Sequence, residues 1–574
     1  MKQFKTVSEG VFTVTEDLHL EELNIAEGAS VAAPEGKKVT MTIGGVATKI
    51  VPGSFQGDIV LRVTDDIPVR FFAYKEPMEY RAAAYIKDGK VCDHQSVPSA
   101  IRSGEVTGAW AKDVKIVCRD EAFNGLFIDG EGEYVIDGAD IDLEGLGGND
   151  FNGYGAAIMS HGTAKVTVNH ASVHVRGASR NSFFVGENSE MTINDSVVLN
   201  ETGILPPGYV DNVDMGGMMR VPWMLGLRGN SRATNLADFG TAHYNRCHLM
   251  AEGWGVLSTD AVDRCRLYAT DCLIEVTGPS GYGAFSIGDC NDVFDHCVFN
   301  VPDYALIQAN DNSCGEFLNG TVVNSGRFGV MSFLNQGGKL VVHDSTFNTA
   351  KAVFLIKGCT PELDVRASRL NSDTNTILQL FDLDDPSGSN RWFFDPKEED
   401  VYIEGRDLTA AVPGHDVIAR FEDMEVCGDF YNATTNIPLD TTGMPEFIMP
   451  AMPEGEEMPP RPEPGPLPKN LDLTFENAAV TGRITAAKAR HRVERVDKTN
   501  CEQLGELDFT AREAINNGVI VTLKSGAVWN VTGTSYLTKL VIEDGASVNA
   551  RSMTVDGVPT PLVPGTYTGK IVIE

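Results

Sequence analysis

Short apolar stretches separated by polar turns recur along most of this chain. Residues 165–169 and 338–343 alternate apolar and polar side chains over about five positions, as half-buried strands do. Asn, Asp, Gly and Ser, the residues that turns favour, fill the gaps between such stretches. No segment of the central region keeps the period of an amphipathic helix. The pattern predicts an all-β protein built from short strands.

An aromatic column recurs at a nearly fixed interval in the middle of the chain. Its members are Trp254, Tyr282, Tyr304, Phe328 and, in a fading fifth copy, Ala352. The steps between them are 28, 22, 24 and 24 residues, which lies in the range of solenoid repeats. We therefore expect neighbouring members to lie in neighbouring layers of one repeating structure.

A second column keeps the same interval, with a polar pair followed by a small residue between two apolar strands. The small residues are Ser172, Ser196, Cys247, Cys272, Cys297, Thr321, Ser345 and Ser368. Units of about 24 residues cannot bury a face alone, so they must stack on one another. Since Ser and Thr occupy the positions equivalent to the cysteines, we expect the column to be an interior stack of small, reduced side chains.

With these repeats, residues 119–427 resemble the right-handed parallel β-helix proteins, the superfamily of pectate lyases, polygalacturonases and many surface adhesins. The resemblance implies a single-stranded right-handed parallel β-helix with projecting loops. Residues 20–63 and 537–574 repeat each other, with Glu-Gly-Ala-Ser or Asp-Gly-Ala-Ser followed by Pro-Gly and an aromatic residue. We expect similar small β modules at both ends of the helix, where they cap it.

These patterns divide the chain into five segments. They are an N-terminal β module (1–63), connecting strands (64–118), the β-helix core (119–427), a Pro-rich acidic linker or arm (428–470) and a C-terminal β module (471–574). Residues 199–222 and 383–400 interrupt the repeat and must project from it. The prolines of 436–469 cannot form ladder hydrogen bonds, so that segment is expected to be a tether or an extended arm.

Charge and composition exclude several classes of partner. With 80 acidic and 47 basic residues the formal net charge is −33, which argues against nucleic-acid binding. No apolar run of 18 residues and no secretory leader is visible, so we expect no membrane span and a cytoplasmic location. There is no CxxC pair and no Cys/His cluster at zinc spacing, so no metal and no cofactor are expected.

Candidate chemistry lies in a polar column six or seven residues after the aromatic one. Asp260 and Asp289 would sit about 5 Å apart on adjacent coils. Two carboxylates at that distance cannot both ionise freely, which creates an acid beside a base and matches retaining glycoside cleavage. His161 and His243 are candidate assisting residues, although histidines at such positions are often turn residues. Stacked Asp and Asn side chains also occur simply as turn ladders.

Aromatic and polar side chains nearby could bind the substrate. These candidates are Trp223, Trp254, Tyr282, Tyr304, Arg220 and Asp311. The aromatic column either stacks in the core or forms a platform for a sugar ring under the 199–222 loop. Ser258-Thr259-Asp260 and Gly288-Asp289 resemble parts of the polygalacturonase motifs, but Ser160-His161-Gly162 lies upstream and no Arg-Ile-Lys follows. Pectate-lyase motifs are also missing, so the resemblance supplies no catalytic residues.

The sequence therefore predicts an enzyme that acts on a small glycoside, an oligosaccharide or another ring-containing molecule by carboxylate acid/base catalysis. Hydrolysis, elimination and isomerisation all use such a pair, and the sequence leaves the choice open. The alternative is a non-catalytic β-helix scaffold or adhesin-like protein. Self-association, where it occurs, would use the end modules or the Pro-rich arm.

Overall fold

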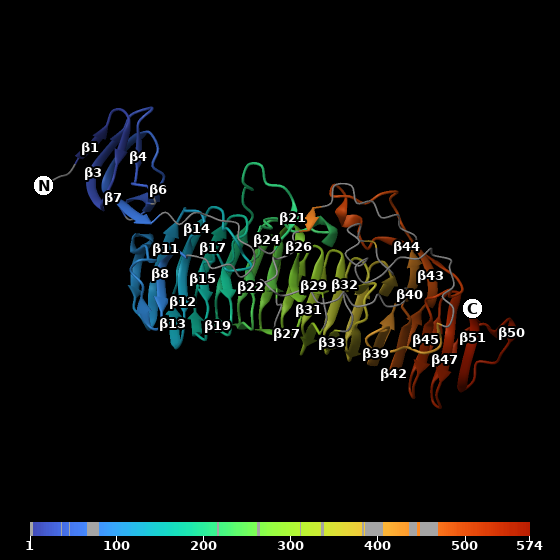
Figure 1. Cartoon of the computed structure of the whole chain (residues 1–574). Helices are drawn as coiled ribbons and strands as arrows, with labels where there is room; N and C mark the ends of the chain where they lie inside the picture. Colours follow the sequence, from blue (N-terminus) through green and yellow to red (C-terminus); the bar gives the residue numbers. More distant parts are fainter. Residues whose placement is uncertain are drawn as a thin grey trace, which may run out of the picture. The chain divides into compact units, whose positions relative to one another are not determined.

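A computed structural model gives the fold of the chain (Figure 1). It describes residues 4–35, 37–44, 46–65, 80–214, 217–260, 264–309, 312–333, 338–381, 384, 406–435, 445–447 and 469–574. Most of the 383–400 projection and of the Pro-rich segment therefore lies outside the described residues. Tertiary contacts divide the chain into two units. Unit 1 contains residues 1–209, 214–219 and 230–235, and unit 2 contains residues 210–213, 220–229 and 236–574.

The prediction of an all-β protein is confirmed. Within the described residues the regular elements are β-strands and single-turn 3-10 helices, with no α-helix. Most strands pair in parallel within a large sheet, while a separate five-stranded sheet occupies the N-terminal region. No helix in the described part of the chain is both long and apolar enough to span a membrane.

In unit 1, three strands recur in fixed order, and each pairs in parallel with the strand three positions later. The first set is β12 (Asn124–Asp129), β13 (Glu133–Asp137) and β14 (Asp140–Glu144). These pair with β15 (Ile158–Ser160), β16 (Lys165–Asn169) and β17 (Ser172–Arg176). The next set is β18 (Phe183–Val185), β19 (Glu190–Asn194) and β20 (Val197–Glu201). Each strand position thus forms its own parallel ladder.

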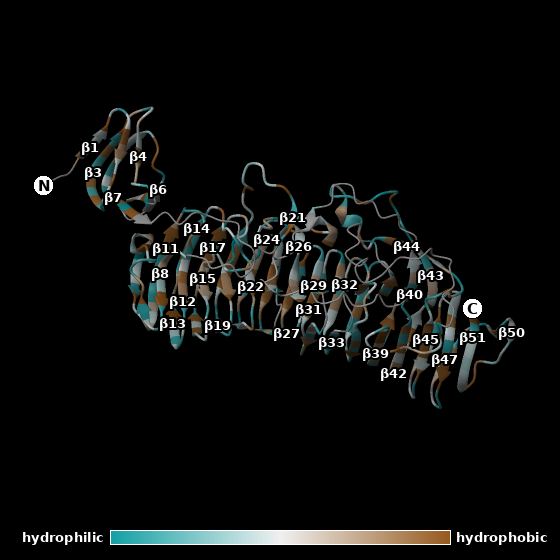
Figure 2. Ribbon diagram, in the orientation of Figure 1, coloured by the Kyte–Doolittle hydropathy of each residue, from teal (hydrophilic) through white to brown (hydrophobic). Residues whose placement is uncertain are grey.

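Unit 2 repeats the same arrangement over more layers. One ladder contains β25 (Cys265–Thr270), β27 (Cys290–Asp295), β30 (Cys314–Leu318), β33 (Lys339–His343) and β36 (Glu362–Arg366). A second contains β26 (Leu273–Ile287), β29 (Tyr304–Ala309), β32 (Phe328–Phe333), β35 (Phe354–Lys357) and β38 (Thr376–Phe381). Alternate residues of β25 and β27 are buried, as the sequence pattern predicts. Figure 2 shows the resulting mixture of apolar and polar positions along the strands.

The polar pairs that mark the repeat are turns in which the second residue is left-handed. His170, Asp195, Arg246, Asp271 and His296 all have φ between 50° and 55°. The residue that follows carries a short, buried side chain: it is Ala171, Ser196, Cys247, Cys272 and Cys297 in these five turns. Ser172, which was expected in this column, is instead exposed and pairs with Val197, one residue past Ser196. The Ser196 hydroxyl accepts the Ala171 N–H at 3.0 Å, and the Ser368 hydroxyl accepts the Ser345 N–H at 3.1 Å.

The cysteines of this column follow the same rule. Cys247, Cys272 and Cys297 are all buried. The Cys247 N–H donates to the sulfur of Cys272 at 3.4 Å, and the Cys297 N–H donates to the Thr321 hydroxyl at 3.1 Å. The expected interior stack of small side chains is therefore present at these positions. It explains why Ser, Thr and Cys occupy equivalent positions in successive coils.

Parallel pairing extends beyond residue 427, the expected end of the repeating core. In unit 2, β39 (Val417–Cys427) pairs with β42 (Leu471–Gly482), and β42 pairs with β45 (Val519–Leu523). In unit 1, part of the 64–118 segment forms β8 (Ala82–Lys87), which pairs in parallel with β12. The antiparallel pair β10 (Ile101–Val106) and β11 (Trp110–Cys118) accounts for much of the rest.

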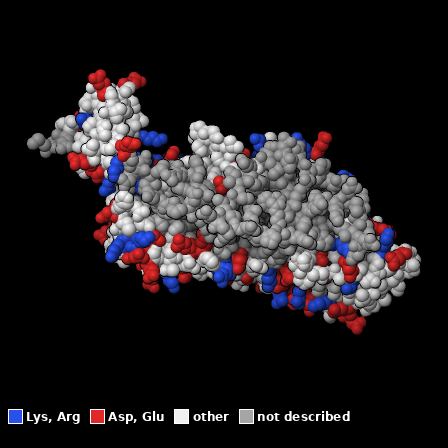
Figure 3. Space-filling view, viewed as in Figure 1, with Lys and Arg blue, Asp and Glu red and all other residues white. Residues whose placement is uncertain are grey.

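Surface charge is mixed in sign despite the large net negative charge. On the face shown in Figure 3, Lys and Arg side chains are interspersed with Asp and Glu side chains. Ion pairs also form between neighbouring strands of the described residues, such as Lys115 in β11 with Asp140 in β14 at 2.7 Å. Exposed pairs of this kind contribute little to stability, but they keep like charges apart.

Candidate functional site

The aromatic column is in register, but it is part of the core. Tyr282 pairs with Tyr304 and Tyr304 pairs with Phe328, and the last two rings stack 5.8 Å apart at 12°. Trp254, in β24 (His248–Asp260), pairs instead with Gly281, one residue before Tyr282. Trp254, Tyr282 and Tyr304 are at most 3% exposed. Of the two expected roles, the structure therefore places this column in core stacking.

The expected Asp260–Asp289 pair does not form. Asp260 is buried and pairs across the ladder with Ile287, so Asp289 lies two residues further along the chain. The Asp289 carboxylate is half exposed and lies 3.6 Å from the guanidinium of Arg266. Two offsets of one residue add up. Trp254 pairs with the residue before Tyr282, and Asp289 lies seven residues after Tyr282 whereas Asp260 lies six after Trp254.

The two candidate histidines occupy different surroundings. In unit 1, the His161 ring packs edge-on against Phe127 at 5.4 Å and Phe184 at 5.7 Å. A side chain at Gly186 would lie 2.6 Å from this ring, so the neighbouring coil needs glycine there. In unit 2, His243 stacks on Tyr268 at 4.8 Å across a parallel ladder. Neither contact brings a histidine to a candidate carboxylate.

The remaining candidate residues belong to loops. Trp223 lies in the 3-10 helix η2 (Trp223–Leu225), where it is 7% exposed and packs with Met224 and Cys501. Arg220 is exposed and forms an ion pair with Asp211. Asp311 lies outside the described residues. These placements do not assemble the predicted groove.

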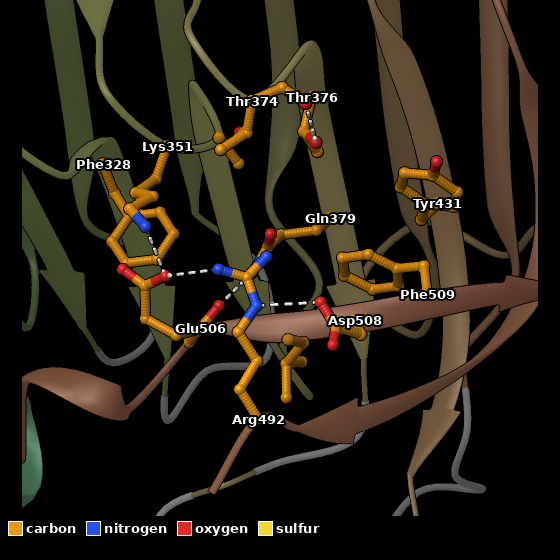
Figure 4. A pocket seen from close by; sticks show the side chains of 13 residues that line it. Phe328, Lys351, Thr374, Thr376, Gln379, Tyr431, Arg492, Glu506, Asp508 and Phe509 are labelled. Carbon is orange, nitrogen blue, oxygen red and sulfur yellow. Dashed lines mark hydrogen bonds and ion pairs between the residues drawn. The ribbon is translucent and has the colours of Figure 1, made fainter.

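Unit 2 instead contains a cavity of about 170 Å³ that sequence reasoning missed (Figure 4). Strands β32 and β38 and the turn containing Lys351 form one side of it. The other side comes from β40 (Asp429–Thr435), Arg492 and the segment 505–509. None of its lining residues belongs to the 199–222 loop, which was expected to cover the site.

Glu506 lies at the centre of this cavity, which we call the Glu506 cavity. Its carboxylate is 9% exposed and accepts a hydrogen bond from the Lys351 ammonium at 2.7 Å. Arg492 lies 3.7 Å from Glu506 and donates to the Asp508 carboxylate at 2.8 Å, so one guanidinium bridges two carboxylates. The dashed lines in Figure 4 follow this alternation of cations and anions. The site thus presents fixed donors and acceptors together.

An aromatic pair forms another wall of the Glu506 cavity. The rings of Tyr431 and Phe509 stack 4.4 Å apart at an angle of 5°. Burial raises the pKa of Tyr431, and its hydroxyl donates to the Asp429 carboxylate at 2.7 Å. Thr374, Thr376 and Gln379 add small polar groups to the lining. A flat apolar wall beside fixed polar groups is the usual composition of a small-molecule site.

Two clamps hold the 501–509 segment in place. Arg327 is buried and donates to the Leu504 carbonyl at 2.8 Å, to the Gly226 carbonyl at 3.1 Å and to the Glu502 carbonyl. Asp303 accepts from the same guanidinium at 3.0 Å. This clamp holds the 3-10 helix η4 (Cys501–Gln503) against the strands below it.

The second clamp lies directly beside Glu506. The Gly505 N–H donates to Asp384 at 2.5 Å, and the Gly505 carbonyl accepts from Gln379 at 2.8 Å. Asp384 also lies 2.8 Å from the Lys357 ammonium and 3.2 Å from His491. Burial raises the pKa of Asp384, but Lys357 and His491 outweigh burial and lower it. Gly505 has φ +83°, and a Cβ at this position would lie 2.9 Å from Leu355 and 3.0 Å from Phe328, so a side chain would not fit.

No cluster of three or more His, Cys, Asp or Glu side chains able to hold a metal occurs among the described residues. No family model, curated protein sequence or solved structure matches this chain. The function therefore has to be argued from the site itself.

Proposed function

We propose that this protein is a right-handed parallel β-helix protein that binds a saccharide unit in the Glu506 cavity. Support for the fold comes from the parallel ladders in each unit, which join most strands to the equivalent strand of the next coil, two or three strands later in the chain. Support for the ligand comes from one observation: the Tyr431–Phe509 pair faces a cavity whose other groups are carboxylates, cations and amides. Sugar rings stack on aromatic faces while their hydroxyls bind such polar groups.

The volume sets the size of the ligand portion that fits. A cavity of about 170 Å³ accepts one sugar ring, with the remainder of an oligosaccharide extending outside it. Glu506 and Asp508 would accept hydrogen bonds from hydroxyls, and Lys351 and Arg492 would donate to ring or carboxylate oxygens. Since both signs of charge line the cavity, neutral and acidic sugars both remain candidates.

Binding to a panel of immobilised oligosaccharides, followed by calorimetry on the best ligand, tests this proposal. The Glu506→Gln variant should bind at least about tenfold more weakly, because it loses a charged acceptor worth roughly 1.5–3 kcal/mol. Glu476→Gln is the matched control, since Glu476 is also paired with a lysine and an arginine but lies outside the cavity. Absence of binding across a broad panel, or equal loss in both variants, contradicts the proposal.

A second candidate function, saccharide cleavage or rearrangement, is favoured by the presence of two carboxylates in one cavity. Glu506 and Asp508 would then take the acid and base roles that the sequence pattern assigns to Asp260 and Asp289. Hydrolysis, elimination and isomerisation all remain compatible with such a pair. Product analysis with the ligand found above separates the two functions: an enzyme loses turnover in Glu506→Gln, whereas a binding protein shows no turnover in the parent.

A further inference from the structure

The four charged side chains that line the Glu506 cavity form two ion pairs. The Lys351 ammonium donates to the Glu506 carboxylate at 2.7 Å, and the Arg492 guanidinium donates to the Asp508 carboxylate at 2.8 Å. Figure 4 shows the two pairs joined by the contact between Arg492 and Glu506, which measures 3.7 Å. With two cations and two carboxylates, the lining has no net formal charge.

Charged groups next to the lining are paired as well. Arg327 lies 3.8 Å from the other oxygen of Glu506, but it donates to Asp303 at 3.0 Å. Beneath Gly505, Lys357 lies 2.8 Å from Asp384. These neighbours therefore add no surplus of positive charge to the site. An acidic ligand would have to compete with a carboxylate of the protein for each of these cations.

A sugar hydroxyl suits such an ion pair better than a carboxylate does. A hydroxyl both donates and accepts, so one hydroxyl can accept from Lys351 and donate to Glu506 at the same time. A carboxylate only accepts. A ligand carboxylate at hydrogen-bond distance from Lys351 would lie within about 6 Å of the Glu506 carboxylate, where the two like charges repel each other. The same holds for Arg492 with Asp508.

We infer that the sugar unit bound in the Glu506 cavity is an uncharged hexose or pentose, an inference that rests on the proposed saccharide site. Such a sugar carries hydroxyls on adjacent carbons, and each ion pair can take one of them as donor and acceptor together. The Tyr431–Phe509 pair supplies an apolar wall for the ring. The formal net charge of −33 acts in the same direction, because it repels acidic polysaccharides at a distance.

The ion pairs also predict how selectivity changes in two variants. Glu506→Gln removes an acceptor and leaves Lys351 without its carboxylate, so the lining gains one positive charge. Neutral sugars should then bind at least about tenfold more weakly, whereas acidic sugars should bind at least about threefold more tightly. Asp508→Asn frees Arg492 and should shift selectivity in the same direction. Because the Asp508 side chain is 69% exposed, this second variant should keep the fold even if Glu506→Gln does not.

Calorimetry on the full-length protein with matched β-1,4-linked trisaccharides tests the inference. Mannotriose is compared with trimannuronate, and cellotriose with triglucuronate, so that each acid differs from its neutral partner by a carboxylate in place of a CH2OH group. The parent should bind the neutral members at least about tenfold more tightly, with little change between about 50 and 500 mM salt. Glu476→Gln, whose carboxylate lies outside the cavity, should change neither affinity.

The outcomes separate this inference from the proposed function. A parent protein that binds the triuronates more tightly than the neutral sugars overturns the inference and leaves the saccharide site in place. Equal weakening of both classes of sugar in Asp508→Asn, or in a folded Glu506→Gln, also overturns it. Absence of binding to either class contradicts the proposed function itself, and the inference then fails with it.

Discussion

Asp292 is a carboxyl group enclosed in the interior of unit 2. It lies on β27 and is completely buried, with the Thr259 hydroxyl 3.2 Å from one oxygen. Burial raises its pKa from 3.8 to about 8. The group therefore keeps its proton in the folded protein at pH values where the unfolded chain has lost it.

This predicts stability that falls as pH rises. Between about pH 4 and pH 8 the folded state binds one more proton at Asp292 than the unfolded state does. The free energy of unfolding should therefore decrease by up to about 1.4 kcal/mol per pH unit in that window. Asp292→Asn resembles the protonated acid and should flatten the dependence. Denaturant unfolding of the parent and of Asp292→Asn from pH 4.5 to 8 measures this pH dependence. If the free energy of unfolding changes with pH equally in both proteins, Asp292 is not its source.

The expected neighbouring positions of Asp260 and Asp289 were wrong because one-residue differences between successive repeats add up along the ladder. The repeat length varies from 22 to 28 residues, and part of this variation is a register shift inside the β24–β26 ladder, between Ala251 and Gly253, which the sequence does not mark. A shift of one residue also turns a side chain to the opposite face of its strand. The Glu506 cavity was missed for another reason: Gln379, Lys351 and Glu506 meet only after the 501–509 segment folds back.

At the scale of elements, the turns of the repeat depend on residues that tolerate left-handed backbone. Asp344, which joins β33 to β34 (Thr346–Thr349), has φ +49° and an exposed side chain. Its N–H donates to the Arg366 carbonyl and its carbonyl accepts from Gly320, so the turn is fixed by the coils on both sides. The backbone cannot relax to accommodate an unsuitable side chain.

The effect of a substitution at Asp344 on stability should therefore depend on how well the new residue tolerates a left-handed backbone. Asp344→Val should lower the free energy of unfolding by about 1–2 kcal/mol, because a β-branched residue disfavours this conformation. Asp344→Gly should be neutral or slightly stabilising, although it removes the same carboxylate. Urea denaturation of the two variants gives the comparison. Equal losses would assign the effect to the carboxylate and contradict the argument from the backbone.

The repeating ladders could be predicted because their signals are local. Apolar alternation, the left-handed turn residue and the small residue after it all lie within one coil, so the sequence carries them in every copy. The 501–509 segment is different, since Arg327 and Asp384 hold it from more than 100 residues away. Such contacts leave no periodic mark in the sequence.

At the scale of the whole molecule, the two end modules share a fold but differ in how they join the rest of their units. The N-terminal module forms its own five-stranded sheet, in the order β1 (Phe4–Val7), β3 (Leu18–Ile25), β7 (Gly53–Asp65), β5 (Lys37–Ile43) and β6 (Val46–Thr48). In the C-terminal module β45 is followed in the same way by β47 (Ser535–Ile542), β51 (Gly565–Ile573), β49 (Met553–Val555) and β50 (Val558–Pro559). The C-terminal module also continues a ladder, because β45 pairs in parallel with β42. In a stacked repeat, stability passes between layers that share an interface, so the two modules should respond differently to the same damage.

Met41 and Met553 are equivalent by register, and both are 2% exposed. Changing either to Ala should destabilise its module by about 2–5 kcal/mol, because each leaves a cavity. Hydrogen exchange should then accelerate in β42 as well as in β45–β51 for Met553→Ala, whereas Met41→Ala should leave β8 and β12 unchanged. Val558→Ala and Val11→Ala, both at positions 63% exposed, serve as controls. Accelerated exchange in β12 with Met41→Ala would show that the N-terminal sheet is coupled to the coils and that its independence is wrong.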